Sequence, residues 1–275
     1  MDARNSYFPF SANLLFGLAM SGYGRPKADF IEEARRIVSA ADERGIPLRL
    51  MGAAAVRIHS PSSLKLHVEI LNRQLTDLDF MTYTKYTRDV RKLFADLNYV
   101  LDEAIARIAE NRDIFHDNYN NRIADVFYDK LDMCHTINFK GRLEVDHPTI
   151  PLADIVLEKL QIVKLNEKDV KDLIVLFNEH PVGETDKDTI NAKYIAKLLA
   201  KDWGFWYTAT TNLKRLRDEF IGMYKLPEDI VKRVKNRVNE LLDYIDKEPK
   251  TMKWKMRAKI GTSRKWYKEV EEVIR

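Results

Sequence analysis

Two aspartates spaced two residues apart are the clearest sign of chemistry in this sequence. In the segment Asp77-Leu78-Asp79-Phe80-Met81, carboxylates alternate with large apolar residues, which is the pattern of a strand. Residues two apart in a strand point to the same face, so Asp77 and Asp79 would stand side by side. Adjacent carboxylates repel each other unless a cation lies between them. Because Mg²⁺ is often held by one or two carboxylates and substrate phosphates, the pair predicts a magnesium site that receives a nucleotide.

A third carboxylate lies in a later apolar segment, Arg122 to Asp129. Alternation would place Asp125, Phe127 and Asp129 on one face of a strand. An acid inside an apolar strand costs free energy unless it is paired or binds a metal. We therefore take Asp125 as the third candidate ligand. Asp129 is nearer the strand end and suits a solvated position.

A glycine turn precedes these strands. The apolar run from Leu48 to Met51 stops at Gly52, and the small residues Ala53 and Ala54 then suit the start of a helix. Backbone N–H groups at a helix N-terminus bind phosphate readily. The turn could therefore hold the phosphates of the nucleotide that the aspartates are expected to receive.

The elements that must position these residues follow from hydrophobic periodicity. The fold class predicted is α+β, with a small mixed sheet and flanking helices over residues 1–148 and an all-helical domain over 149–275. Expected strands are Leu48–Met51, Asp77–Tyr83, Asp113–Asp117, Arg122–Tyr128 and an edge strand at Asn138–Leu143. Expected helices are Asp29–Arg44, Ala53–His59, Thr87–Asp96, Leu101–Ala109, Leu152–Val163, Glu167–His180, Asp188–Lys201, Leu213–Tyr224, Glu228–Lys247 and Arg264–Arg275.

The overall composition indicates the cellular environment that we expect for this protein. No apolar run in the 275 residues approaches the ~20 needed to span a membrane, so we expect no membrane partner. The apolar stretch Leu14 to Met20 lacks the basic flank of a signal peptide and is interpreted as packed structure. The single cysteine, Cys134, excludes an internal disulfide and fits a reducing cytoplasm.

The C-terminal part is strongly basic. Lys247 to Lys268 contains nine Lys or Arg residues and one acid, Glu248, so it carries +8 in a chain of net charge +4. Such a patch suggests an anionic partner. Aromatic residues alternate with the basic ones at Lys253–Arg257 and Trp266-Tyr267, an arrangement that could stack bases and contact phosphates of single-stranded RNA. The commoner interpretation is an amphipathic surface whose aromatic residues are buried and whose basic residues face water.

The order of these motifs resembles the polymerase-beta-like nucleotidyltransferase superfamily. A glycine turn opens a helix of small residues, Asp77-x-Asp79 lies on the next strand, and Asp125 lies on a later one. The segment is most similar to the branch of minimal nucleotidyltransferases and abortive-infection nucleotidyltransferase toxins. In that branch an arginine precedes the paired aspartates, as Arg73 does here, and a lysine-bearing helix precedes a Lys-Asp-x-x-Asp segment, as Lys159 precedes Lys168–Asp172. The resemblance covers roughly Ile31 to Leu176.

The resemblance implies a reaction and a set of site residues. The reaction is transfer of a nucleoside monophosphate from an NTP to an acceptor hydroxyl, on an RNA end or a protein side chain, with release of pyrophosphate. Asp77, Asp79 and Asp125 would be catalytic and would bind Mg²⁺ or Mn²⁺. The implied nucleotide-binding residues are Gly52, Ala53, Ala54, Arg73 and Lys159.

Several of these roles have ordinary structural alternatives. Arg73 could contact phosphate or pair with Asp77, and Lys159 could neutralise a triphosphate or be a solvated helix lysine. Asp172 suits an ion-paired helix surface with Lys168 and Lys171.

Ala53 departs from the family pattern, which usually has Gly or Ser there. A competing function is therefore a nucleotide-binding or antitoxin-like regulatory module on the same fold without turnover. A more distant alternative is a structural protein whose aspartates only solvate strand ends.

Overall fold

A five-stranded mixed sheet forms the first half of the computed structural model, which describes residues 23–270. The expected packed segment Leu14 to Met20 lies outside the described residues. The strands in spatial order are β1 (Arg49–Met51), β2 (Asp77–Thr82), β5 (Arg122–Tyr128), β4 (Arg112–Asp117) and β3 (Val100–Leu101). β2 and β5 are parallel, and the other neighbours are antiparallel.

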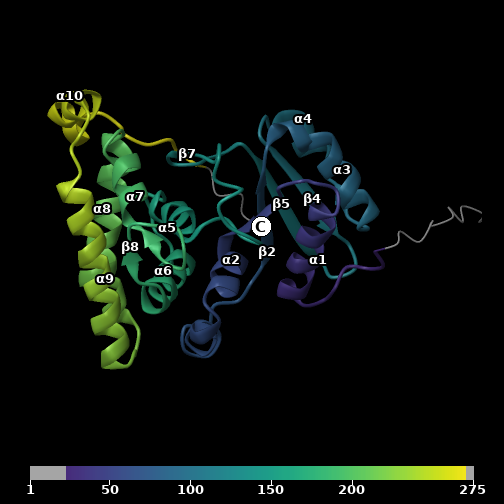
Figure 1. Ribbon diagram of the computed structural model, residues 1–275, viewed down its shortest axis with the longest axis horizontal. Coiled ribbons are helices and arrows are strands. Elements are labelled where there is room, and N and C mark those ends of the chain that lie inside the picture. The colour runs from purple at the N-terminus through teal and green to yellow at the C-terminus, as the bar shows by residue number, and fades with distance from the viewer. Residues whose placement is uncertain (1–22, 271–275) are drawn as a thin grey trace, which may run out of the picture.

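Four helices accompany the sheet (Figure 1): α1 (Phe30–Asp42), α2 (Gly52–His59), α3 (Thr87–Asp96) and α4 (Glu103–Ile108). α1 begins where the Asp29 side chain accepts hydrogen bonds from the N–H groups of Ile31 and Glu32, a common helix N-cap. α2 follows β1 directly and lies between the sheet and the helical half of the molecule in Figure 1. Its N-terminus therefore starts at the edge of the sheet where β1 ends.

Helices dominate the second half. They are α5 (Leu152–Leu160), α6 (Glu167–Glu179), α7 (Ala192–Leu199), α8 (Trp203–Asp218), α9 (Glu228–Lys247) and α10 (Met252–Ile260). Two short strand pairs accompany the larger elements: β6 (Lys130–Asp132) with β7 (Thr136–Asn138), and β8 (Val182–Gly183) with β9 (Ile190–Asn191). α9 packs on α6, α7 and α8, while α5 packs on α2. One continuous apolar core therefore runs through both halves.

The short helical segments complete the described chain. Single turns of 3₁₀-helix lie at Pro61–Ser63, Thr84–Tyr86, Phe220–Met223 and Gly261–Ser263, and a π-helical turn lies at Leu66–Ile70. No helix among residues 23–270 is long and apolar enough to cross a membrane.

The predicted α+β class is confirmed, with a small mixed sheet followed by a helical part. The expected edge strand Asn138–Leu143 is wrong, because β7 ends at Asn138 and the chain then turns, with the Arg142 N–H donating to the Phe139 carbonyl. Phe139 and Leu143 are fully buried as turn residues. The apolar pattern there reflects burial without strand pairing.

Two helix predictions in the C-terminal part are also wrong. α8 starts at Trp203, well before the expected Leu213, because the Asp202 side chain caps it by accepting the Phe205 N–H. No helix forms over 264–270, the described part of the expected Arg264–Arg275 helix. α10 lies earlier and ends at Ile260, directly before Gly261, whose φ is +59°.

Candidate active site

Three carboxylates lie on one face of the sheet. The parallel register of β2 and β5 places Asp79 directly beside Asp125, and Asp77 shares the face of Asp79 because it lies two residues away. Burial raises the pKa of Asp79 well above its usual value, and the nearby carboxylates of Asp77, Asp125 and Glu158 raise it further. The three predicted aspartates thus lie on one face of the sheet, and Glu158 is a fourth acid whose charge acts on Asp79.

Asp125 is held by an arginine that the sequence did not single out. Arg112 on β4 donates from Nε to Oδ1 over 3.0 Å and from Nη2 to Oδ2 over 2.9 Å. Such two-point pairs are among the stronger charge-assisted hydrogen bonds. Asp125 is buried, with 1% of its surface exposed. Its charge is therefore already balanced, whereas Asp79 lies among other acids.

Gly52 lies in direct contact with Asp79. It connects β1 to α2 and has a φ of +67°, a left-handed conformation that favours glycine. A Cβ added there would lie 2.5 Å from Asp79 Oδ2, well inside contact distance. Glycine is thus required both for the turn and for the close approach of the carboxylate. Ala53 and Ala54 follow as buried residues in the first turn of α2.

A carboxylate from α5 occupies the N-terminus of α2. Glu158 Oε2 accepts the Gly52 N–H over 3.1 Å, so the backbone donor expected to bind phosphate is bonded to an anionic side chain. Burial raises the pKa of Glu158, while Lys159 and the Gly52 N–H act in the opposite direction. Sequence reasoning missed Glu158, although its position beside Lys159 was a usable signal.

Lys159 is buried, so its interpretation as a solvated helix lysine is wrong. Its Nζ lies 3.1 Å from Glu158, 3.4 Å from Asp169 and 3.3 Å from Asp172, and its exposed fraction is 6%. Burial alone would lower the pKa of Lys159, but Glu158, Asp172 and Asp169 together raise it well above the usual value. A permanent positive charge therefore lies beside the carboxylates.

The expectation that Asp172 is a surface residue paired with neighbouring lysines is also wrong. Asp172 is fully buried, and it accepts hydrogen bonds from Arg73 Nε (3.1 Å) and His67 Nε2 (3.0 Å). Burial raises the pKa of Asp172, but Lys159, His67 and Arg73 outweigh it and lower the value to about 2. Arg73 thus anchors the segment before β2 to α6.

The chemistry of this donor set fits a divalent cation. Among residues 23–270, no three His, Cys, Asp or Glu side chains are arranged so that they could hold a metal by themselves. A Mg²⁺ ion that shares its coordination with substrate phosphates needs only one or two carboxylates, and Asp77 and Asp79 provide two. Burial is the main cause of the raised pKa of Asp79, and the neighbouring carboxylates add to it; a cation bound there would favour the charged carboxylate.

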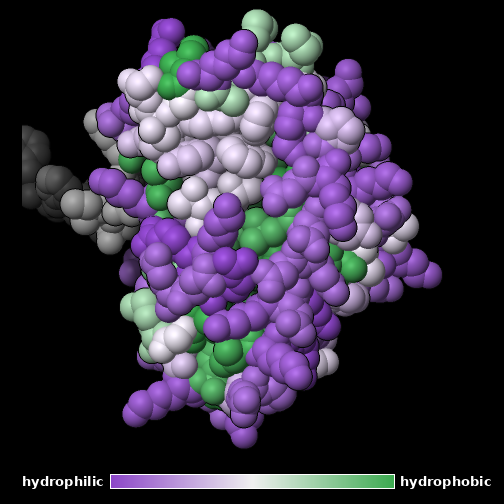
Figure 2. Space-filling view, turned by 90° about the vertical axis from the view of Figure 1, so that its left-hand side faces the viewer, coloured by the Kyte–Doolittle hydropathy of each residue, from purple (hydrophilic) through white to green (hydrophobic). Residues whose placement is uncertain are grey.

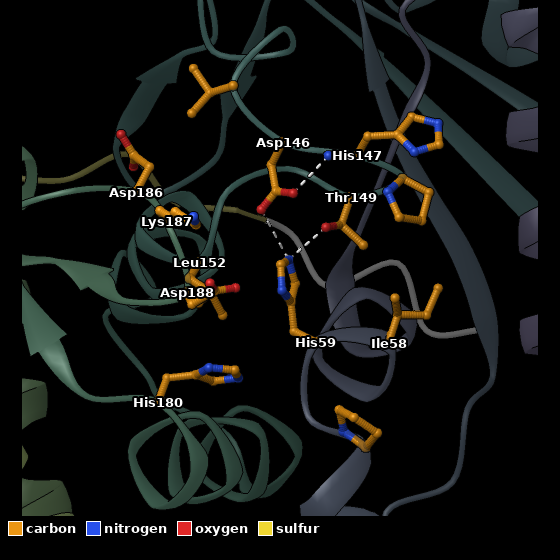
Figure 3. A pocket seen from close by; sticks show the side chains of 13 residues that line it. Ile58, His59, Asp146, His147, Thr149, Leu152, His180, Asp186, Lys187 and Asp188 are labelled. Carbon is orange, nitrogen blue, oxygen red and sulfur yellow. Dashed lines mark hydrogen bonds and ion pairs between the residues drawn. The ribbon is translucent and has the colours of Figure 1, made fainter.

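A separate cavity of about 470 Å³ lies at the other end of α2. Figure 3 shows His59, Asp146 and Thr149 on one side of it and His180 on the other. His59 Nε2 lies 2.5 Å from Thr149 Oγ1 and 3.2 Å from the Ile150 carbonyl. The predicted aspartates do not line this cavity.

Comparison with known proteins leaves the family of this chain open. No protein-family model and no curated protein matches it. The solution structure of the antibiotic-resistance factor ANT(2'')-Ia is similar over 83% of this chain and 91% of that chain, at 10% identity and a TM-score of 0.34. Similarity at this level does not establish an activity for this chain.

Proposed function

We propose that this protein is a metal-dependent nucleotidyltransferase that moves a nucleoside monophosphate from an NTP to an acceptor hydroxyl. The observation that carries the proposal is the register of β2 and β5, which places Asp79 beside Asp125, with Gly52 against the Asp79 carboxylate. This combination joins a carboxylate pair to a backbone turn at a helix N-terminus, the two features that a bound nucleotide–metal complex requires.

Asp77 and Asp79 would hold the Mg²⁺ or Mn²⁺ ion. Such an ion neutralises charge that develops on transferring phosphates and orients them. The Gly52 turn and the first N–H groups of α2 would bind the triphosphate, for which the Gly52 N–H must leave Glu158. Lys159 would supply positive charge behind the turn while it remains tied to Asp169 and Asp172.

The transfer step itself needs few groups. The acceptor oxygen forms a bond to the α-phosphorus, the bond from that phosphorus to the bridging oxygen breaks, and pyrophosphate leaves. Phosphoryl-type transfer depends mainly on positioning and charge neutralisation. Asp125 would take the hydroxyl proton, since carboxylate oxygens that accept hydrogen bonds from Arg112 retain further lone pairs.

Pyrophosphate release tests this proposal. Wild-type protein with Mg²⁺, each of the four NTPs, and RNA or protein acceptors should release pyrophosphate. The Asp77→Asn/Asp79→Asn variant should lose release by at least about a hundredfold, because neither neutral amide can replace an anionic metal ligand. Asp89→Asn, an exposed residue of α3, is the matched control. Release by the double variant at the wild-type rate would refute the site assignment.

The second candidate function is a nucleotide-binding module without turnover. The contact that favours it is the Glu158–Gly52 hydrogen bond, which places a carboxylate where the triphosphate is needed. Calorimetry would then show NTP binding without release of pyrophosphate by the same preparation. Measurable release would eliminate this candidate.

A further inference from the structure

All four tryptophans of the chain belong to one aromatic cluster formed by α8, α10 and the segment after α10. The rings of Trp206 and Trp254 meet edge to face at 5.0 Å between centroids. Tyr207 joins the other two, because it stacks on Trp203 at 5.2 Å and meets Trp266 at 5.1 Å. Trp203 is buried and the other three tryptophans are half-buried. The cluster therefore presents ring surface to solvent.

A small hollow opens within this cluster. Its volume is about 180 Å³, and the side chains that line it include those of Trp203, Trp254 and Trp266 together with Lys201 and Lys253. Sites that enclose a whole small molecule are typically ~300–1,000 Å³. The hollow is therefore too small for a complete ligand of that kind and suits one planar ring.

The segment after α10 closes one wall of the hollow. A Cβ on Gly204 would lie 2.5 Å from the Trp266 carbonyl oxygen, so this segment lies directly on the first turn of α8. Trp266 Nε1 donates to Thr208 Oγ1 over 3.1 Å. Nε1 of Trp254 is buried and has no hydrogen-bond partner within residues 23–270. Nε1 of Trp206 is likewise buried without a partner among these residues, so neither N–H is exposed to solvent.

Positive charge lies at the hollow, which Lys201, Lys253 and Arg257 line together with Asp202, and continues along α10. Lys201, Lys253, Lys255 and Lys259 are exposed, and the Arg257 guanidinium lies 4.7 Å from the centre of the Trp203 ring. Figure 2 shows this side of the molecule, with a pale area in the hydropathy range of tryptophan and tyrosine near its top and hydrophilic side chains around it. Aromatic rings among lysines are the combination that binds single-stranded nucleic acids.

We propose that this tryptophan surface, made of Lys201, Trp203, Lys253, Trp254 and Trp266, binds single-stranded RNA. One unpaired base stacks in the hollow while the exposed lysines contact phosphates. A duplex would not fit, because its bases are stacked on each other and unavailable to the rings.

Asp202 favours RNA over DNA. Asp202 also lines the hollow. Its carboxylate caps α8 by accepting the Phe205 N–H, and the remaining lone pairs can accept a hydrogen bond from a ribose 2′-hydroxyl, the group that distinguishes RNA from DNA. The proposed RNA-binding site does not depend on catalysis. If the protein is a nucleotidyltransferase, the bound RNA would also be its acceptor, and only this last step rests on the proposed function.

Intrinsic fluorescence provides a direct test, because every tryptophan lies in the cluster. Titration of the full chain with an unlabelled 12-nucleotide single-stranded RNA should quench the emission saturably. Contacts to about four phosphates predict a slope of log K against log salt of about −3. Single-stranded DNA of the same sequence and duplex RNA should bind more weakly. Absence of quenching, or equal binding of DNA or duplex RNA, would overturn the proposal.

Two pairs of variants separate binding from folding. Lys253→Gln/Lys255→Gln should reduce the salt slope by about 1.4, whereas Lys225→Gln/Lys232→Gln, an exposed pair around the start of α9, should leave it unchanged. Trp254→Ala should weaken binding at least about fivefold and Trp254→Phe should largely retain it, since any aromatic ring can stack. Equal effects of the two lysine pairs would contradict the assigned surface.

Binding to lipid vesicles tests the alternative that the anionic partner is a membrane surface. α10 also exposes Met252, Met256 and Ile260, with 71%, 59% and 45% of their surface accessible, an apolar stripe beside lysines that could lie on a lipid surface. If the surface binds RNA as proposed, the protein should not co-sediment with vesicles of phosphatidylcholine and phosphatidylserine. Co-sedimentation that Lys253→Gln/Lys255→Gln abolishes, without RNA binding, would assign the surface to lipid and overturn the RNA proposal.

The Asp77→Asn/Asp79→Asn variant should bind RNA like the wild type, which separates a failure of the RNA proposal from a failure of the catalytic proposal.

Discussion

At the scale of single residues, the central feature is the contact between Gly52 and Asp79. The turn between a strand and a helix was predictable from Leu48–Gly52 and the small residues after it, as was the strand that carries Asp77 and Asp79. The partners were not predictable. Glu158 comes from a helix distant in sequence, and Arg112 lies on the strand next to that of Asp125, where its role depends on a strand register that periodicity does not encode.

Gly52→Ala should impair both stability and activity. Its φ of +67° disfavours any side chain, and the new Cβ would lie 2.5 Å from Asp79 Oδ2. Gly45→Ala is a matched control, because Gly45 has a φ of +68° and no atom within 4 Å of an added Cβ. Each should lose about 1 kcal/mol of unfolding free energy from backbone strain, and only Gly52→Ala should also abolish NTP binding, as measured by calorimetry. Equal loss of NTP binding in the two variants would contradict the contact argument.

Glu158→Gln should strengthen NTP binding. The Glu158 carboxylate accepts the Gly52 N–H and adds to the negative charge around Asp79, so a neutral side chain should compete less with a triphosphate. An anion at a helix N-terminus is worth about 0.3–1 kcal/mol, which corresponds to a decrease in the NTP Kd of about two- to fivefold by titration calorimetry. Glu240→Gln, on the exposed face of α9, should have no effect. A weaker Kd for Glu158→Gln would show that Glu158 supports the nucleotide instead of competing with it.

At the scale of elements, buried charges connect the two halves of the molecule. Asp172 on α6 accepts hydrogen bonds from His67 in the π-helical turn and from Arg73 before β2, while Lys159 on α5 lies 3.3 Å from it. Sequence periodicity predicted α6 well but assigned Asp172 to its surface, because a helix pattern does not show which charged residues find buried partners. The same limitation explains why Lys159 could be assigned either way.

The cavity at the end of α2 predicts a pH dependence of stability. Burial lowers the pKa of His180 to about 4, and the neighbouring His59 lowers it as well. Below the unfolded value of about 6.5, the unfolded chain binds a proton that the folded protein does not, so stability should fall from pH 6.5 towards pH 4. At pH 5 the loss from His180 should be about 2 kcal/mol relative to pH 7.

Urea unfolding at pH 7 and pH 5 checks this prediction. The wild type should lose more unfolding free energy between the two values than His180→Gln does, with a difference of about 2 kcal/mol. Identical losses for the two proteins would show that His180 is not held neutral by its surroundings.

At the scale of the whole molecule, the order of the elements was predictable to a large extent. The α+β class and most helices followed from hydrophobic periodicity, and α9 spans Glu228–Lys247 as predicted. The C-terminal part was harder, because Met252 and Met256 are exposed on α10 while Trp254, between them, packs on Trp206. Apolar residues on two faces of a short helix give no clear period, so the helix was predicted too late in the chain.

The whole-molecule arrangement places α2 between the sheet and α5 (Figure 1). The acids of the sheet and the Glu158–Lys159 pair of the helical half therefore face one site. Under the proposed function, both halves would contribute to the transfer, and the transferred group would be the nucleoside monophosphate.

A double-label transfer experiment tests that claim most directly. Wild-type protein is incubated with Mg²⁺ and acceptor pools, in parallel with NTP labelled at the α-phosphate and NTP labelled at the γ-phosphate. The account predicts that the α-label becomes covalently attached to an acceptor and that the γ-label appears in pyrophosphate, both only with Asp77 and Asp79 intact. Attachment of the γ-label to the acceptor, or α-label transfer by Asp77→Asn/Asp79→Asn, would contradict it.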